Sequence, residues 1–583
     1  MVLHKVRGVV FFAIALAATV ALAATPPSGT LNAPAAGQTA SINWAGGPFT
    51  GATADPGVCT TLTCDTYQLA VNIPATFYSS NPNYAVHVRI DWSSSTNDFD
   101  LNVLDAAGNV VCSSAQGGTI FEDADCGPLA AGTYTVQVVG FTVVNATYTG
   151  TASVAPEPTS AVGLARYKPG KFTFSTPLVL PGPPNTLSGQ QGIEPRVAVD
   201  PVGNLYAAAI QGVPAGTDAW KSMDGGNSWK YLGQPDGAQA AAVSIGRGEG
   251  LGGGDEDIAI GHTGNVYVTS LWLGSATQSK STDGGNTWIV NPLSTDIPAV
   301  DREWIASYGD NIVYLTYKQL GVALSGTESI FVAKSFDGGV TFPQIVEATT
   351  PQFGVQPGDQ GNIVVDPTTG YVYTSFIGQN DETKLYQARS VDGGLSWTIK
   401  QVYSAASGSL VNVFPITGVD RVGNVYIDFS DGHNIYLTAS SDHGATWTTP
   451  VRVSNGTGTK TSLSAWIEGG DVGKVNLMWW GTGASSNMDP AANWQVFMAQ
   501  SQNALANVPT FTQSAVSGVM HTGAICTNGT GCASGTRNLA EYFAHTTYLD
   551  GNAMVVYPDD KNNASPMTTF VKQTSGSKIT GSK

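Results

Sequence analysis

The sequence repeats one short motif five times: SMDGGNSW begins at Ser222, STDGGNTW at Ser281, SFDGGVTF at Ser335, SVDGGLSW at Ser390 and SSDHGATW at Ser440. Successive copies of this Ser-x-Asp-x-Gly-x-x-aromatic motif start 50 to 59 residues apart. In each copy the Asp carboxylate can accept backbone N–H bonds across a tight turn, the Gly can adopt a positive φ, and the aromatic ring can fill a hydrophobic gap. The motif therefore predicts a structural turn that recurs once per repeat, not a catalytic group.

A second pattern precedes each copy, in which a buried strand runs into a turn and then into a further strand. It reads RVAVDPVGNLYAA, DIAIGHTGNVYVTS, WIASYGDNIVYLTY, NIVVDPTTGYVYTSF and ITGVDRVGNVYIDF, with weaker copies AWIEGGDVGKVNLMWW and YFAHTTYLDGNAMVVY. Seven such repeats predict an all-β fold with a seven-bladed propeller over residues 172–583, and six blades are the alternative. FSTPLVL at Phe174 copies the WTTPVRV that follows the fifth motif, so we expect this N-terminal strand to complete the last blade and to close the ring.

The turn motifs are similar to the Asp-box (BNR) repeats of the sialidase-like β-propellers. In that family the motif lies on the outer turns of the blades, away from the active site, and the resemblance implies the same arrangement here. It also implies the groups of an exo-sialidase: three arginines that hold the substrate carboxylate, a tyrosine nucleophile assisted by a glutamate, and an aspartate acid/base. Sialidases proper have six blades, one fewer than the seven repeats of this chain.

The resemblance can be carried to individual positions. Arg196 takes the place of the first arginine, just before the first inner strand, although the family's Arg-Ile-Pro is Arg-Val-Ala here. Arg537 and Tyr542, in the last repeat, correspond by their order to the later arginine and to the nucleophile. The looser assignments are Arg302, Asp257 and Asp301.

Charged residues gather just before the inner strand of several repeats, where a propeller brings its blades together at the channel mouth. Only 12% of the chain is charged, so this concentration is informative. Crowded carboxylates raise one another's pKa, which can supply the protonated acid and the ionised partner that glycoside cleavage needs. The same charges could instead hold calcium or form ion pairs around a wet channel. The candidate catalytic residues are Arg196, Asp257, Asp301, Arg302, Glu303, Arg537, Glu541 and Tyr542, and Glu194, Asp255, Glu256 and Asp359 lie among them.

Residues 25–156 predict a separate jelly-roll-like β-sandwich. Apolar and polar residues alternate from Tyr84 to Trp92, which is typical of a half-buried strand. The succession NDFDLNVLDAAGNVV and AAGTYTVQVVG resembles the pre-peptidase C-terminal (PPC) domain, a small module attached to secreted hydrolases. Residues 157–171 are rich in proline and predict a linker.

Metal and disulfide sites are also predicted. Oxygen ligands suit calcium, and a solvated acidic loop is the alternative. The predicted calcium ligands are Asp98, Asp100 and Asp123. Three close cysteine pairs predict three local disulfides in an exported chain. These pairs are Cys59 with Cys64, Cys112 with Cys126, and Cys526 with Cys532.

The N-terminus predicts the compartment. Lys5 and Arg7 precede an apolar run from Val9 to Leu22, which predicts a signal peptide over residues 1–23 and a secreted protein without a membrane span. A net charge of −17 disfavours binding to nucleic acid. We therefore expect a secreted glycoside hydrolase that acts on an extracellular glycan and needs no cofactor other than, at most, calcium. The alternative is a non-catalytic propeller that binds a glycan or a protein at the cell surface.

Overall fold

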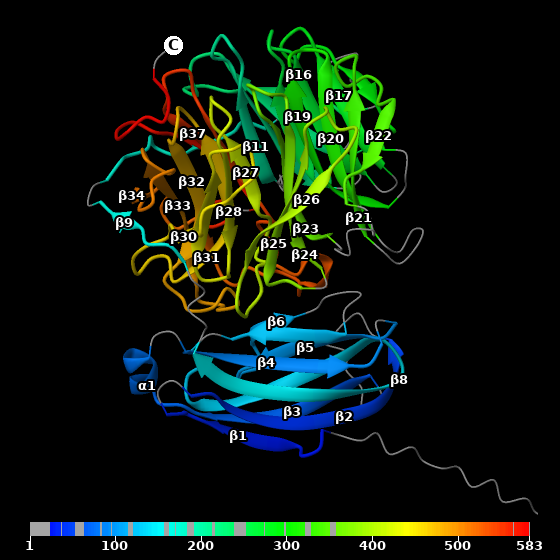
Figure 1. Ribbon diagram of the computed structural model, residues 1–583, viewed down its shortest axis with the longest axis vertical. Coiled ribbons are helices and arrows are strands. Elements are labelled where there is room, and N and C mark those ends of the chain that lie inside the picture. The colour runs from blue at the N-terminus through cyan, green and yellow to red at the C-terminus, as the bar shows by residue number, and fades with distance from the viewer. Residues whose placement is uncertain are drawn as a thin grey trace, which may run out of the picture.

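The structure is a computed structural model, and nearly all of its elements are strands (Figure 1). It describes residues 24–581 except for 36–37, 53–62, 82–83, 95, 115–119, 127, 157–161, 169–170, 183–191, 213–215, 238–251, 273–274, 296–298, 321–327, 350–356, 380 and 564. The predicted signal peptide and Cys59 lie outside these residues. Within the described residues, the helical elements are α1 (Ala75–Ser80) and a 3-10 turn at Gly529–Gly531. No helix in the described ranges is long and apolar enough to cross a membrane.

The repeats form a seven-bladed β-propeller, as the sequence predicts. In each blade the first strand is innermost and hydrogen-bonds outward through antiparallel neighbours. The first three blades are β11 (Ile193–Val199), β12 (Leu205–Gly212), β13 (Gly216–Ser222) and β14 (Lys230–Gly233); β15 (Glu256–Ile260), β16 (Val266–Trp272), β17 (Ser275–Ser281) and β18 (Ile289–Asn291); and β19 (Val300–Tyr308), β20 (Ile312–Gln319), β21 (Ser329–Ser335) and β22 (Gln344–Glu347).

The next blades follow the same order. They are β23 (Pro357–Val365), β24 (Val372–Gly378), β25 (Lys384–Ser390) and β26 (Thr398–Ser404); β27 (Ile416–Val419), β28 (Val425–Ser430), β29 (Ile435–Ser440) and β30 (Val451–Arg452); and β31 (Thr461–Gly469), β32 (Val475–Thr482), β33 (Asn493–Ser501) and β34 (Thr510–Ala515). The sixth blade also carries β35 (His521–Thr522) beside β33 and β9 (Arg166–Tyr167) beside β34. Thus β9, which lies within the predicted linker, is paired with the propeller.

The last blade closes the ring with a strand from the N-terminal side. It consists of β36 (Ala544–Thr547), β37 (Ala553–Asp559), β38 (Met567–Lys572) and β10 (Leu178–Val179). Leu178 pairs with Phe570, and the Leu180 N–H donates to the Thr568 carbonyl at 2.9 Å. Leu180 and Phe570 belong to one buried cluster that also contains Trp220 of the first blade. The closing strand predicted from FSTPLVL is therefore present.

Strand pairing in the first blade shows which end of the propeller carries the turn motifs. Val199 pairs with Leu205, and Leu205 with Ser222, so the turn motif lies at the end where the inner strand stops. Ile193, at the start of the inner strand, pairs with Ile210 at the opposite end. The residues that precede the inner strands therefore lie on the face opposite the turn motifs.

The turn motifs make the hydrogen bonds that their sequence predicts. In the first copy, Asp224 Oδ1 accepts the Ser228 N–H at 2.9 Å, and the Ser222 hydroxyl accepts the Gly226 N–H at 2.9 Å. Gly226 has φ +82°, and a Cβ there would lie 2.3 Å from the Phe570 ring, so glycine is required. Hydrogen bonds from the Ser228 hydroxyl and N–H lower the pKa of Asp224 to about 2. These groups stabilise the turns and lie on the face opposite the channel mouth.

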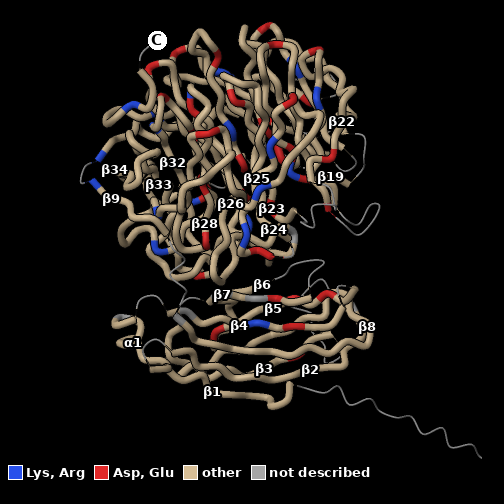
Figure 2. The backbone as a smooth tube through the Cα atoms, viewed as in Figure 1, with Lys and Arg blue, Asp and Glu red and all other residues tan. Residues whose placement is uncertain are grey.

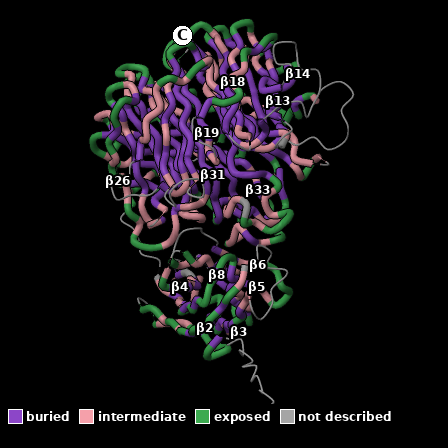
Figure 3. The backbone as a smooth tube through the Cα atoms, turned by 90° about the vertical axis from the view of Figure 1, so that its right-hand side faces the viewer, coloured by how far each residue is buried: buried purple, intermediate pink, exposed green. Residues whose placement is uncertain are grey.

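Strands of residues 24–156 fold around a second core. They are β1 (Ser28–Asn32), β2 (Ala40–Ala52), β3 (Cys64–Asn72), β4 (Tyr84–Trp92), β5 (Asp98–Leu104), β6 (Val110–Ser114), β7 (Phe121–Asp125) and β8 (Gly132–Pro156). The first part of the long strand β8 pairs with β3 and β5, and its second part pairs with β2 and β4. Both parts enclose one apolar cluster, which is separate from the propeller interior (Figure 3).

Two of the three predicted disulfides are present. Cys112 of β6 is bonded to Cys126, and Cys526 is bonded to Cys532 in the loop before the last blade. Cys64, at the start of β3, was predicted to pair with Cys59, which lies outside the described residues.

The closing strand generates a stability prediction with an internal control. Leu180 is 2% exposed, whereas Leu178 of the same strand is 37% exposed. We expect Leu180→Ala to lower the free energy of unfolding of the propeller by about 2–5 kcal/mol, because it removes a buried side chain. Leu178→Ala should cost less than about 1 kcal/mol. Chemical denaturation followed by tryptophan fluorescence measures both, and equal losses would contradict closure at this strand.

Candidate functional site

The inner strands begin with irregular backbone on the mouth face. Glu194, Arg302 and Ser464 have φ values of +52°, +63° and +54°, which non-glycine residues rarely adopt. At each of these places the pairing with the second strand shifts register. Such bulges redirect side chains and are typical of functional sites. Two of these three bulges therefore hold a charged residue at the start of an inner strand.

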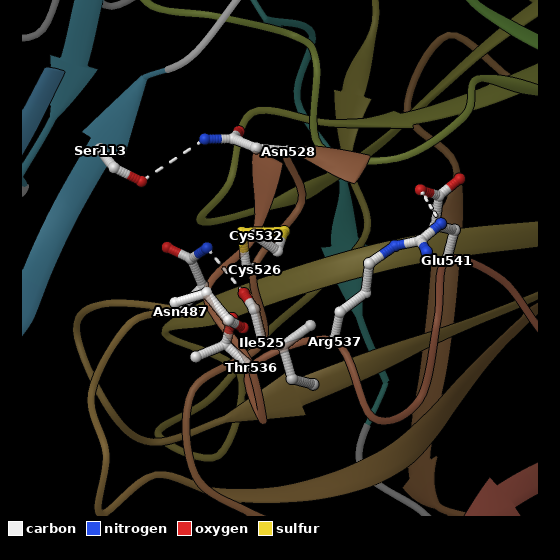
Figure 4. Close-up of a disulfide and its surroundings, with 10 residues drawn as sticks. Ser113, Asn487, Ile525, Cys526, Asn528, Cys532, Thr536, Arg537 and Glu541 are labelled. Carbon is white, nitrogen blue, oxygen red and sulfur yellow. Dashed lines mark hydrogen bonds and ion pairs between the residues drawn. A yellow bond between two sulfur atoms is a disulfide. The ribbon is translucent and has the colours of Figure 1, made fainter. Parts of the chain in front are cut away.

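Four charged residues form a network of ion pairs and hydrogen bonds across this mouth. The Glu541 carboxylate accepts hydrogen bonds from Arg302 Nη1 of the third blade and from Arg537 Nη2. The contact with Arg537, at 2.5 Å, is drawn in Figure 4. Its backbone N–H donates to Glu194 Oε1 of the first blade at 2.8 Å. Glu541 precedes the inner strand of the last blade, so the network joins residues from three blades.

Two further carboxylates surround Arg302. Asp255 Oδ2 accepts a hydrogen bond from the Arg302 backbone N–H at 3.2 Å and lies 3.9 Å from the side-chain atom Arg302 Nη1. Asp301 Oδ2 lies 3.6 Å from Arg302 Nε. Burial raises the pKa of Asp255 to about 6; the charge of Asp301 adds to the rise, and Arg302 and Arg537 oppose it. Asp255 therefore holds a proton in mildly acidic solution.

A second layer of predicted residues lies beneath the mouth. Arg196 Nε donates to Asp257 Oδ1 at 2.5 Å, and the Arg196 guanidinium stacks on the Trp466 ring at 4.0 Å. Asp257 Oδ2 accepts the Ile305 N–H of the next blade at 2.9 Å. Glu303 is fully buried, and burial raises its pKa well above the usual value. The contacts of Arg196 and Asp257 join neighbouring blades.

Tyr542 belongs to an aromatic cluster that fills the centre of the ring. Its ring centroid lies 4.8 Å from that of Trp304, 6.1 Å from Phe414 and 6.5 Å from Trp466. Its hydroxyl accepts the Glu256 N–H at 3.0 Å and also donates to the Glu256 carbonyl. At 2% exposure, the hydroxyl of the predicted nucleophile is covered by protein in this structure.

A cavity of about 1190 Å³ lies above the mouth, between the propeller and residues of β4–β7. Four of the predicted catalytic residues line it. These four are Asp301, Arg302, Arg537 and Glu541. Asp255 and Asp359, which lie near them in the sequence pattern, line the cavity as well. The other four predicted residues, Arg196, Asp257, Glu303 and Tyr542, are not in its lining. The structure thus divides the candidate set into a cavity group and a buried group.

The N-terminal domain covers this mouth and contacts it directly. The Ser486 hydroxyl donates to the Val111 carbonyl at 2.7 Å, and Asn528 Nδ2 donates to the Ser113 hydroxyl at 3.4 Å (Figure 4). Asn528 lies in the loop closed by the Cys526–Cys532 disulfide. This disulfide therefore constrains a loop that carries a contact between the domains.

Sequence reasoning did not predict that residues of the N-terminal domain line this cavity. His87, Arg89 and Asp98 line the wall opposite the propeller mouth. His87 and Arg89 alternate with buried residues along β4, which indicates that both point away from the sandwich core. The alternation cannot indicate what they face. The Arg89 guanidinium stacks on Phe121 at 4.0 Å and pairs with Asp91 at 2.6 Å.

The predicted calcium ligands lie on two strands. Asp98 and Asp100 are on β5 and Asp123 is on β7; the side chain of Asp123 lies outside the described parts. Burial raises the pKa of Asp98 to about 6 and that of Asp100 to about 7, and the charge of Asp98 adds to the second rise. Among the described residues, no three His, Cys, Asp or Glu side chains are grouped so that they could hold a metal ion. Calcium binding stays a prediction.

A smaller cavity of about 390 Å³ lies near the opposite face, where the inner strands end. Asp200, Glu468 and Tyr548 are among its lining residues. Burial raises the pKa of Glu468 to about 7, while Arg196 opposes the rise. None of the predicted catalytic residues lines this second cavity.

Comparison with known proteins gives neighbours at low similarity. No family model and no curated protein sequence matches the chain. Solved structures that match include an α-L-arabinofuranosidase from Fusarium graminearum (15% identity, 56% of this chain and 98% of that chain, TM-score 0.37). A leech intramolecular trans-sialidase matches at 12% identity over 85% and 94% of the two chains, with TM-score 0.37. A six-bladed fucose-binding lectin from Aleuria aurantia matches at 12% identity over 59% and 98%, with TM-score 0.35. Similarity at this level assigns no activity to the chain.

Proposed function

We propose that the protein is a secreted glycoside hydrolase of the Asp-box, sialidase-like kind, which cleaves an extracellular glycan at the propeller mouth. The PPC-like sandwich is proposed as an accessory domain that covers this site. The observation that carries the proposal is the floor of the cavity, where Asp255 and Asp301 flank Arg302. Two carboxyl groups, one protonated and one ionised, are the usual catalytic pair for glycosidic bond cleavage.

The proposed roles follow from the surroundings of each group. Asp255, whose pKa is raised to about 6, would donate a proton to the leaving-group oxygen. Asp301, whose side chain is more exposed than that of Asp255, would act as the second carboxyl group, which stabilises positive charge on the sugar or activates water. Arg302 would hold both carboxylates in place, since its guanidinium lies 3.9 Å from the carboxylate of Asp255 and 3.6 Å from that of Asp301.

A non-catalytic glycan-binding propeller is the second candidate. It is favoured by the position of Tyr542, whose hydroxyl is bonded to the Glu256 backbone and does not line the cavity. It is also favoured by the ion pairs that Glu541 makes with Arg302 and Arg537, because structural networks of this kind occur without catalysis.

Removing the proposed acid should abolish most of the turnover. We expect Asp255→Asn to lower kcat/KM on polysaccharides by about 10²–10⁴-fold, the usual contribution of a general acid. The loss should be smaller on 4-methylumbelliferyl glycosides, because an aryl leaving group needs little protonation. Reducing-sugar release and fluorophore release measure the two rates.

The matched control for this experiment is Asp550→Asn. The Asp550 side chain is 44% exposed and pairs with Lys578. Asp550 lies beyond the end of β36, the inner strand of the last blade. Its substitution should leave both rates unchanged. Equal losses in the two variants would contradict the role of Asp255, and binding without turnover by the unaltered protein would favour the second candidate.

The pH dependence of turnover follows from the same carboxyl group. A general acid must be protonated, and Asp255 loses its proton as the pH rises through about 6. We therefore expect kcat/KM to fall tenfold per pH unit above that value. A pH profile between 4 and 8 on a polysaccharide tests this, and a constant kcat/KM across the range would exclude Asp255 as the acid.

A further inference from the structure

The charge of the interdomain cavity selects against one class of glycan. Among the residues that the structure describes, nine Asp and Glu residues and four Arg and Lys residues line it. Acids lie on both of its walls, with Asp98 on the N-terminal domain and Asp359 on the fourth blade. Acidic residues are also visible where the two domains face each other (Figure 2). A ligand with a carboxylate would enter a field of like charge.

All four cations of the cavity already hold a carboxylate of the chain itself. Arg302 and Arg537 both bind Glu541. Lys318 pairs with Glu328 at 3.0 Å, and Arg89 pairs with Asp91 at 2.6 Å.

Of these ion pairs, those that Arg302 and Arg537 form with Glu541 most resemble a carboxylate-binding site. Two arginines from different elements converge on one carboxylate, which is the way such groups are recognised in proteins. Here the carboxylate is the chain's own, it is 3% exposed, and its backbone carbonyl is fixed by the Ser464 hydroxyl at 2.8 Å. A ligand carboxylate would have to displace Glu541 and leave that buried charge unpaired, which is costly.

We infer that the cavity accepts glycans without carboxylate groups, either neutral or amino-bearing, and rejects sialosides and uronides. Sugar hydroxyls and ammonium groups are hydrogen-bond donors, and the partly exposed carboxylates of the wall are acceptors for them. The inference rests on the proposed function only in taking a glycan as the ligand. It also implies that the carboxylate grip of an exo-sialidase is not available in this chain.

A glycan array tests the inference by binding alone. The mature chain would be applied at pH 7 to immobilised neutral, amino-bearing and carboxylate-bearing oligosaccharides. We expect every bound glycan to lack a carboxylate; binding of a sialoside or uronide, or of no glycan at all, would overturn the inference. Raising the salt concentration should weaken binding of amino-bearing glycans and leave that of neutral glycans unchanged, which distinguishes these two sources. If the protein binds neutral glycans without cleaving them, the hydrolase proposal is contradicted and the inference about carboxylate rejection is supported.

Two variants test the cause of the selection. Glu541→Gln releases Arg302 and Arg537, so binding of the carboxylate-bearing form of a recognised glycan should rise at least about tenfold. Because Glu541 is buried, Asp359→Lys serves as the second variant: it places an additional cation on the wall and should give a gain in the same direction. Asp550→Lys, on the opposite face, is the matched control and should give none. Absence of a gain in Asp359→Lys would overturn the electrostatic explanation.

Discussion

Backbone hydrogen bonds between β10 and β38 hold the first and last segments of the propeller together, and the geometry of the mouth depends on them. Each inner strand contacts the inner strands of the neighbouring blades, and β11 contacts β36 where the ring closes. This closure brings Glu194 of the first blade against the backbone of Glu541, 347 residues later. Without it, the charged residues that precede the inner strands would have no common centre, because no single blade contributes more than a few of them.

The two ends of the propeller serve different purposes as a result. The turn motifs fix one face with Asp–backbone hydrogen bonds, as in Asp224, and the same Ser, Asp and Gly recur in all five copies. On the other face several inner strands start with a bulge, and the residues there differ from blade to blade. Those residues build two layers, with a charged floor around Arg302 above and an aromatic core around Tyr542 below. The N-terminal domain then covers the floor, so that the cavity is bounded by both domains.

The blades and their closure could be predicted from the sequence because each depends on local patterns: strand alternation, glycines with positive φ, and one copied strand at Phe174. The site could be predicted only in part. The position before an inner strand predicts that Arg302 and Glu541 approach the mouth, but 239 residues separate these partners, and nothing local tells that they pair. The same positional rule could not separate Asp301, which lines the cavity, from Arg196, which lies beneath it. The wall formed by His87 and Arg89 depends on domain docking, which leaves no periodic signal.

A crystal structure of the protein with an oligosaccharide selected by the binding measurements tests the proposed site most directly. We expect the glycan in the cavity of about 1190 Å³, with hydroxyl groups within hydrogen-bond distance of Asp255 or Asp301 and with Glu541 still bound to Arg302. A glycan bound at the opposite face near Asp200 and Tyr548, or a ligand carboxylate in place of Glu541, would contradict this expectation.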